Sequence, residues 1–447
     1  MALGIRLVRL SDPEGLMFDE TYYAKDACLY IGEDPRFCGL EQSTEQSYVH
    51  PPMGKWLIAA GIKTFGYNEF GWRISSAIFG TFLVLLVFLL ARKLFRDRWV
   101  AGAAAFLVAT DFLMIVQSRI AMLDIFQAFF VVLGFLFLAH DRERVQIQHE
   151  HLRLAFPGDP PPREFEWRIS AGVAFGMAVA VKWSAAWALA AAAILAAVWS
   201  LGLIADRVKK ARQSTLKVGG AGAELAVLFL SMILIPGLIY LTSYSLYFSD
   251  SLSSNCPYKE KNGECVTGAS GAAKSFLSLQ DRMIDYHLTL RVKHAYQSDA
   301  LTWPVVKRPV AYFYEGEPKS RHVMAVGNPA VWWPAMAAGV WLLIRSRKSF
   351  APERVVVLGW IAQYVPWILV QRPLFFFYMT PVVPFMMIGL AVALGALAER
   401  AKWLRVAAIV YLVTAGVLML TYMYPVIAAV GLEYGQWNNR MLMKSWI

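Results

Sequence analysis

Charged side chains are scarce in this chain of 447 residues. They make up 17% of it, whereas hydrophobic residues make up 57%, and the mean hydropathy is +0.45. This balance excludes an ordinary soluble domain and predicts an all-α protein that crosses a membrane several times. The net charge of +11 comes largely from basic residues clustered between apolar runs, so it gives no reason to expect a nucleic-acid partner.

Cysteine is also rare, with one pair at Cys28 and Cys38 and another at Cys256 and Cys265. Neither pair has the two-residue spacing of common zinc sites, and no histidine cluster lies beside them. We therefore expect neither a metal site nor another cofactor. The short separations allow two local disulfides if the pairs face an oxidising compartment, and free thiols are the alternative.

A signal peptide is missing from the start of the sequence. Met1–Leu10 has no apolar core and no cleavage site, and it is too short to cross a bilayer. Because the segment that follows is expected on the outside, we predict that a further transmembrane helix precedes Met1 and that Met1–Leu10 is its outer end.

Long apolar runs, by contrast, recur along the whole chain. We predict ten transmembrane helices, near 73–91, 99–116, 121–139, 168–183, 185–205, 224–245, 328–344, 354–370, 374–396 and 405–427. They divide the chain into four regions. These are a first external segment (1–72), a block of membrane helices (73–245), a second external segment (246–327) and a C-terminal helical block with an external tail (328–447).

Lysine and arginine collect in every second loop. The clusters are Arg92, Lys93, Arg96 and Arg98; Arg142, Arg144, Arg153, Arg163 and Arg168; Arg207, Lys209, Lys210, Arg212 and Lys217; Arg345, Arg347 and Lys348; and Arg400, Lys402 and Arg405. Since positive loops stay in the cytoplasm, the alternate loops are predicted to face outward from the plasma membrane.

Two adjacent carboxylates, Asp19 and Glu20, lie in the first external segment. Mutual repulsion and partial drying at a membrane surface would raise the pKa of at least one of them. A raised pKa suits a proton acceptor that works near neutral pH. The alternative interpretation is a pair of solvated acids in a polar loop.

Three basic residues, Arg119, Lys182 and Arg372, are predicted at the outer ends of membrane helices, and Asp124 lies close to Arg119 in the sequence. Long basic side chains at such positions often only reach for lipid head groups. Three cations on the same side as an acid pair also suit a site that holds a lipid phosphate. Glu224, in contrast, is expected at a cytoplasmic helix start, where an acid only complements the helix dipole.

Two further segments contribute candidate substrate-binding residues. His50 and Lys55 belong to a Pro-Pro turn that opens an amphipathic helix, and its apolar face of Trp56, Leu57, Ile58 and Ile62 is predicted to lie in the membrane interface. His287 and His294 lie among aromatic residues of the second external segment that could stack on a sugar. Ordinary surface histidines are the alternative.

Several of these segments also occur together in a known family. They are F-D-E-T-Y-Y from Phe18, H-P-P-M-G-K from His50, S-R-I-A-M-L-D from Ser118, K-W-S from Lys182, Y-H from Tyr286, H-A-Y from His294, W-P from Trp303 and G-N-P-A-V-W-W from Gly327. In this order they resemble the protein O-mannosyltransferase family, in its bacterial, actinobacterial-type branch. The resemblance runs from about Leu7 to the C-terminus.

The resemblance implies a membrane glycosyltransferase of the GT-C class with about eleven helices, of which about ten are expected in this chain. Such an enzyme transfers mannose, with inversion, from polyprenyl phosphate mannose to Ser or Thr hydroxyls of secreted or membrane proteins. The acceptors are expected to meet it at the protein export channel. The resemblance assigns Asp19 as general base, Glu20 as its partner and Arg119 as a donor-phosphate contact. From their position, Lys182 and Arg372 are expected to stabilise the same phosphate, with Asp124 among the substrate-binding residues.

Two other classes stay open. A related GT-C enzyme could move aminoarabinose or another sugar from the same kind of lipid onto a lipid or polysaccharide. A transporter is the other alternative, but transporters keep their charged sites near the centre of the bilayer, whereas the charges of this chain are predicted at one surface.

Overall fold

The computed structural model describes residues 1–40, 48–153, 165–213, 221–261, 263–347 and 350–447. Three basic residues of the predicted cytoplasmic loops, Arg163, Lys217 and Lys348, lie outside these ranges, and the side chains of Arg153, Lys210 and Arg212 are not described either.

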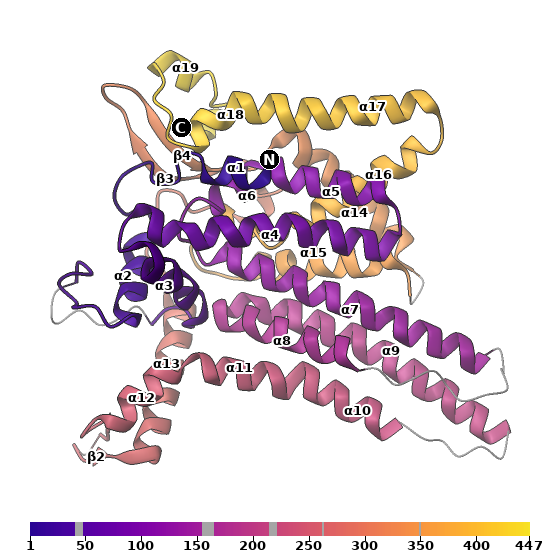
Figure 1. Ribbon diagram of the computed structural model, residues 1–447, viewed down its shortest axis with the longest axis horizontal. Coiled ribbons are helices and arrows are strands. Elements are labelled where there is room, and N and C mark those ends of the chain that lie inside the picture. Colours follow the sequence, from indigo (N-terminus) through magenta and orange to yellow (C-terminus); the bar gives the residue numbers. More distant parts are fainter. Residues whose placement is uncertain (41–47, 154–164, 214–220, 262, 348–349) are drawn as a thin grey trace.

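Five long apolar stretches run side by side and are long enough to cross a membrane at 1.5 Å per residue (Figure 1). In the described part of the chain they are α4 (Glu69–Phe95), α7 (Asp124–Arg153), α9 (Ala186–Gln213), α10 to α11 and α17 to α18. The last two each contain a π-helical turn: α10 (Ala221–Phe229), η2 (Leu230–Leu234) and α11 (Ile235–Ser243); α17 (Lys402–Val413), η5 (Thr414–Leu418) and α18 (Met419–Ile427). The protein is therefore a multi-pass membrane protein.

The other predicted spans correspond to shorter helices within the same bundle. These are α5 (Arg98–Thr110), α6 (Phe112–Gln117), α8 (Glu166–Val181), α14 (Pro329–Arg345), α15 (Pro352–Ile368) and α16 (Val383–Ala398). Their buried faces form one apolar core, in which Phe135 packs edge-on against Phe175 and Phe385.

Two predicted spans are not single helices. The run 99–116 is broken at Asp111, whose carboxylate caps α6 by accepting the Met114 amide at 3.1 Å and also accepts the Trp332 indole N–H at 2.7 Å. The run 374–396 begins with the 3₁₀ turn η4 (Phe376–Met379), and α16 starts only at Val383. Pro381 and Pro384 explain this late start, because proline lacks the N–H that a helix interior needs.

The remaining elements gather at one end of the bundle, on the left in Figure 1, except the first of them, which packs along α4. They are α1 (Ala2–Leu7), α2 (Glu20–Tyr30), α3 (Met53–Phe65), η1 (Trp183–Ala185), α12 (Ser245–Ser253), β1 (Tyr258–Lys259), β2 (Cys265–Val266), α13 (Gly268–Thr289), η3 (Ala300–Thr302), β3 (Val310–Glu315), β4 (Arg321–Ala325), α19 (Tyr434–Asn438) and η6 (Lys444–Trp446). Strands β1 and β2 pair antiparallel, as do β3 and β4, with Val310 opposite Ala325.

Both cysteine pairs form disulfides at this end. Cys28 is bonded to Cys38, with 5.7 Å between their Cα atoms, and Cys256 is bonded to Cys265, with 5.2 Å between theirs. The second bond closes the β1–β2 hairpin. Of the two alternatives for the cysteines, the structure supports disulfides.

The predicted interfacial helix is α3, but its apolar face does not lie free. Ile58 and Ile62 are fully buried, and α3 packs against α2, α4 and α8. Trp56 and Leu57, on the same face, are half-buried, so the placement of this helix in the membrane interface stays a prediction. The pattern of an amphipathic helix cannot distinguish a protein core from a membrane interface, because both environments remove the same apolar side chains from water.

At the opposite end, Glu224 does more than complement a helix dipole. Its buried carboxylate binds Arg144 at 3.0 Å and Arg168 at 3.1 Å, and both arginines also bind Asp141 at 2.8 Å and 2.7 Å. These four charges join α7, α8 and α10. A buried charge needs such partners, and the sequence could not show which loops would supply them.

Candidate active site

Asp19 marks the start of α2, and the local backbone holds it in place. Its carbonyl oxygen accepts the amides of Tyr22 and Tyr23, and its side chain accepts the Tyr23 hydroxyl at 3.3 Å. The preceding Phe18 has a φ of 48°, in the left-handed region, which costs a residue with a Cβ about 1–3 kcal/mol. Phe18 is held there by Tyr312, with ring centroids 4.8 Å apart, and by Phe377 at 5.7 Å.

Glu20, the neighbouring acid, is fully buried and fully occupied. Arg73 of α4 donates Nε to Oε1 at 2.9 Å and Nη2 to Oε2 at 3.0 Å. The amides of Ala121 and Met17 each donate to one of the same oxygens at 2.9 Å. Glu20 therefore ties the Asp19 turn to α4 and to the start of α7. Arg73 was not predicted as its partner, because nothing in the sequence links two residues 53 positions apart.

Lys182 and Asp124 form a buried ion pair close to Asp19. The Lys182 ammonium donates to Asp124 Oδ1 at 2.8 Å and lies over the Tyr378 ring, 4.7 Å from its centroid. Asp124 opens α7, where a helix N-terminus favours a negative charge, and Lys182 follows the last residue of α8. A lysine ammonium has three donors, so this contact leaves capacity for a further anion.

Gly54 lets α3 approach this ion pair. A Cβ there would lie 2.6 Å from the Leu123 side chain and 3.3 Å from that of Val181, and these residues directly precede Asp124 and Lys182. The glycine of the H-P-P-M-G-K motif thus permits a close contact between helices beside the site.

Arg372 reaches the same cluster from the turn before η4. One Nη donates to His287 Nδ1 at 2.8 Å, and the other donates to the Tyr378 hydroxyl at 3.3 Å. Because arginine can only donate, Nδ1 of His287 is the acceptor, so Nε2 carries the proton and donates it to the Val49 carbonyl at 3.0 Å. Burial lowers the pKa of His287 to about 4, which keeps this neutral form through the physiological range.

His50 completes the cluster. Its ring centroid is 5.6 Å from that of His287 and 6.1 Å from that of Tyr23. Burial, followed by the charge of Lys182, holds its pKa well below the usual range. Within the described part of the chain, its buried Nδ1 has no hydrogen-bond partner. A neutral imidazole with a free ring nitrogen can bind a hydroxyl group.

The surroundings raise the pKa of Asp19 to about 6. Burial is the main cause and the charge of Asp124 adds to it, whereas Lys182 and the Tyr23 hydroxyl act in the opposite direction. A carboxylate with this pKa is mostly ionised at neutral pH and is basic enough to accept a proton.

Three predicted site residues lie elsewhere. Arg119 is buried against the N-terminal segment, where its guanidinium donates to the carbonyls of Ile5, Arg6, Val8 and Arg9. Lys55 forms a buried ion pair with Asp26 at 2.7 Å, which joins α3 to α2. His294 is exposed and packs at the edge of the aromatic group around Phe18.

Tyr23, Tyr312 and Tyr378 were not predicted as part of the site. Tyr23 could have been found, because a residue four positions after Asp19 lies on the same face of a helix. Tyr312 and Tyr378 come from β3 and η4, whose proximity only the tertiary structure creates. Among the described residues, no three His, Cys, Asp or Glu side chains converge to hold a metal ion.

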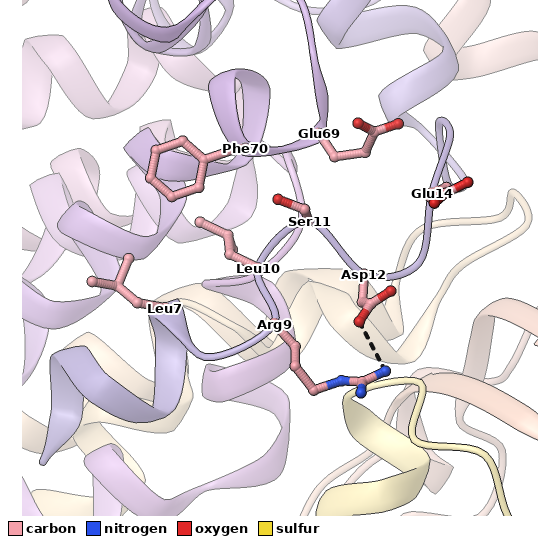
Figure 2. A pocket seen from close by; sticks show the side chains of 8 residues that line it. All are labelled: Leu7, Arg9, Leu10, Ser11, Asp12, Glu14, Glu69 and Phe70. Carbon is pink, nitrogen blue, oxygen red and sulfur yellow. Dashed lines mark ion pairs between the residues drawn. The ribbon is translucent and has the colours of Figure 1, made fainter.

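A separate groove lies between residues 7–14 and the start of α4 (Figure 2). Arg9 and Asp12 form an ion pair at 2.8 Å on its wall, and Glu69 and Phe70 line the opposite side. None of the predicted site residues lines this groove.

Comparison with known proteins decides the family. Residues 1–251 match the family model for dolichyl-phosphate-mannose-protein mannosyltransferase, and residues 272–446 match the model for the C-terminal four-helix region of protein O-mannosyltransferase. The chain belongs to the protein O-mannosyltransferase family. It is therefore a glycosyltransferase, as the sequence motifs predicted.

The individual relatives are of two kinds, which differ in how much of this chain they match. A polyprenol-phosphate-mannose–protein mannosyltransferase of Mycobacterium tuberculosis is 29% identical, with 99% of this chain and 88% of the relative aligned. An undecaprenyl phosphate-α-4-amino-4-deoxy-L-arabinose arabinosyl transferase of Pseudomonas aeruginosa is 35% identical, but only over 41% of this chain and 31% of the relative.

Solved structures confirm the predicted GT-C fold. The Saccharomyces cerevisiae Pmt1–Pmt2 complex bound to the sugar donor matches with a TM-score of 0.76 and 14% identity, covering 100% of this chain and 91% of the other. ArnT from Cupriavidus metallidurans bound to undecaprenyl phosphate matches with a TM-score of 0.57 and 16% identity, over 95% and 63% of the two chains.

Proposed function

We propose that this membrane enzyme transfers mannose from polyprenyl phosphate mannose to Ser or Thr hydroxyls of proteins. The observation that carries this function is the full-length similarity to protein mannosyltransferases. The cluster described above, with the Asp19 carboxylate beside two cations, is consistent with it. Asp19, Lys182 and Arg372 are the residues that the proposal depends on.

The proposed chemistry is a single displacement at the anomeric carbon, which inverts its configuration. Asp19 accepts the proton of the acceptor hydroxyl as the new carbon–oxygen bond forms, a contribution of about 10²–10⁴ in rate. The bond between the anomeric carbon and the phosphate oxygen breaks, and the polyprenyl phosphate leaves as an anion. It needs no acid, only positive charge to stabilise it.

Lys182 and Arg372 are proposed to supply that charge. Arg372 also lines a groove whose other walls hold the cations Arg291 and Lys293, the acid Asp299 and the apolar side chains of Trp367, Ile368 and Val370. Such a lining suits a phosphate followed by a hydrocarbon chain. We assign this role to Lys182 and Arg372 rather than to Arg119, because the Arg119 guanidinium is occupied by four backbone carbonyls.

The other predicted residues take supporting roles. Glu20 positions Asp19 through Arg73, and Asp124 orients Lys182. His287 holds Arg372, and the free Nδ1 of His50 is proposed to bind a sugar or acceptor hydroxyl.

We also propose that the cluster faces the exterior of the plasma membrane. The ends of α4, α7 and α9 that carry basic clusters lie at the opposite end of the bundle, as expected for cytoplasmic ends, and both disulfides lie at the end that carries the site cluster (Figure 1).

The direct test is transfer by membranes that contain the full chain. They are incubated with radiolabelled polyprenyl phosphate mannose and either a Ser/Thr-rich secreted peptide or a glycolipid acceptor, beside membranes with the Asp19→Asn variant. Label in the peptide that depends on Asp19 is expected. Label only in the glycolipid would refute protein mannosylation and favour the aminoarabinose-transferase type of reaction, which the shorter Pseudomonas similarity brings into consideration.

A further inference from the structure

Helix α13 has two different apolar faces. Phe276, Leu279 and Met283 are buried against Tyr244 of the preceding segment. A second row, Leu277, Ile284 and Leu288, is exposed by 62%, 43% and 66%. Residues spaced by seven and four positions fall on one stripe of an α-helix, so these three side chains form an apolar strip, interrupted by Asp281, that the described part of the chain leaves uncovered.

A third face of the same helix is polar. The exposed residues Lys274, Asp281, Asp285 and Thr289 lie along one side of the apolar strip, with Asp281 at its border and Thr289 farthest from it. The helix therefore presents protein contact, then an apolar strip, then a water-compatible face. Three such sectors are typical of a helix that lies in a membrane interface beside the protein that carries it.

Hydrogen bonds fix the height of α13 relative to the membrane helices. The Tyr240 hydroxyl of α11 donates to Gln280 at 2.6 Å and accepts the indole N–H of Trp183, which follows α8, at 2.9 Å. In Figure 1, α13 lies at the left ends of α8 and α11, where the bundle meets the smaller elements. A tryptophan and tyrosines at this level are the residues that favour a bilayer interface.

The apolar strip also continues a surface that must face lipid. Only 17% of the apolar window in the span from α10 to α11 is buried within the protein. Exposed apolar side chains continue from α11 into α12: Leu241 of α11 is 43% exposed, and Leu246 and Leu252 of α12 are 38% and 53% exposed. After the β1–β2 hairpin the chain enters α13, which packs against α12.

We propose that α13 lies in the bilayer interface at the end of the protein that carries the cluster, with Leu277, Ile284 and Leu288 inserted among the lipids. The partner that covers the apolar strip is therefore the lipid bilayer. His287, which binds Arg372, is adjacent to Leu288, so the contact with lipid sets the position of one wall of the cluster relative to the membrane surface.

Single cysteines carrying an environment-sensitive fluorophore test the proposal. All four native cysteines are paired, so an added thiol is labelled selectively. Two of the three strip positions have a matched control one residue further on the polar face: Ile284→Cys with Asp285→Cys, and Leu288→Cys with Thr289→Cys. The full chain is reconstituted in phosphatidylcholine vesicles with spin-labelled lipids that quench at a shallow depth. All four positions are exposed, so labelling leaves the core intact.

Quenching by lipid at positions 284 and 288 should exceed that at 285 and 289 by about threefold or more, and a water-soluble quencher should show the opposite order. Equal accessibility to the aqueous quencher at all four positions would overturn the proposal. So would oxidative cross-linking of Leu288→Cys between two chains that persists on dilution in lipid, because the strip would then be covered by a second copy.

Discussion

Replacing Asp19 by asparagine should show whether this residue, and not another acid of the cluster, is the general base. In the folded protein the pKa of Asp19 rises from 3.8 to about 6. Relative to water, the site therefore favours the neutral form of the Asp19 carboxyl by about 3 kcal/mol. If the carboxylate is the base, kcat/KM should be close to its plateau at pH 7 and fall about tenfold per pH unit below about 6.

The assay is transfer of labelled mannose to a peptide, measured from pH 4.5 to 8 with membranes that contain equal amounts of enzyme. Asp19→Asn should lower kcat/KM by about 10²–10⁴ and abolish the acidic limb. Asp12→Asn, which removes an acid outside the cluster, should keep both the rate and the limb. His287 cannot produce a limb near 6, since its pKa is lowered to about 4.

The same change should affect stability in the opposite direction. A carboxyl whose pKa is raised on folding binds its proton more tightly in the folded state, so its unfavourable contribution is present above about pH 6 and disappears below about pH 4. Asp19→Asn should therefore melt at a slightly higher temperature than wild type at pH 7. An unchanged acidic limb in Asp19→Asn would refute Asp19 as the base, and a lower melting temperature would refute burial as the cause of its raised pKa.

Four further substitutions test how the site is built and held. Lys182→Met should raise the KM for the lipid donor and lower kcat. Arg119→Ala should lower the melting temperature and leave the donor KM unchanged. A rise in donor KM that is larger for Arg119→Ala than for Lys182→Met would contradict our assignment. Arg73→Met should cost about 3–5 kcal/mol of stability, because it leaves the Glu20 carboxylate buried without its partner; chemical denaturation measures this, and a loss below about 1 kcal/mol would contradict it. Cys28→Ser should increase proteolysis after α2 while transfer by the intact fraction persists, and unchanged proteolysis would show that the disulfide does not restrain this segment.

The sequence by itself determined that the protein lies in a membrane, how many apolar segments it has and which family it belongs to. These properties depend on composition and on motifs whose residues are contiguous, such as F-D-E and H-P-P-M-G-K. A run of about 20 apolar residues has few structural solutions other than a membrane helix, because every backbone group must be satisfied within the bilayer. Asp19, Lys182 and Arg372 were also predicted together, since topology placed all three on one side.

The tertiary structure decided which polar groups share partners. Sequence position suggested that Arg119 joins the phosphate-binding cations, but its guanidinium binds the N-terminal carbonyls. Sequence position also predicted α3 as an interfacial helix, and only the structure shows that its Ile58 and Ile62 are buried against protein. Arg73, Tyr312 and Tyr378 came to the site from distant segments. A buried charge is neutralised by whichever group the fold brings within about 3 Å, and that choice depends on helix packing rather than on local pattern.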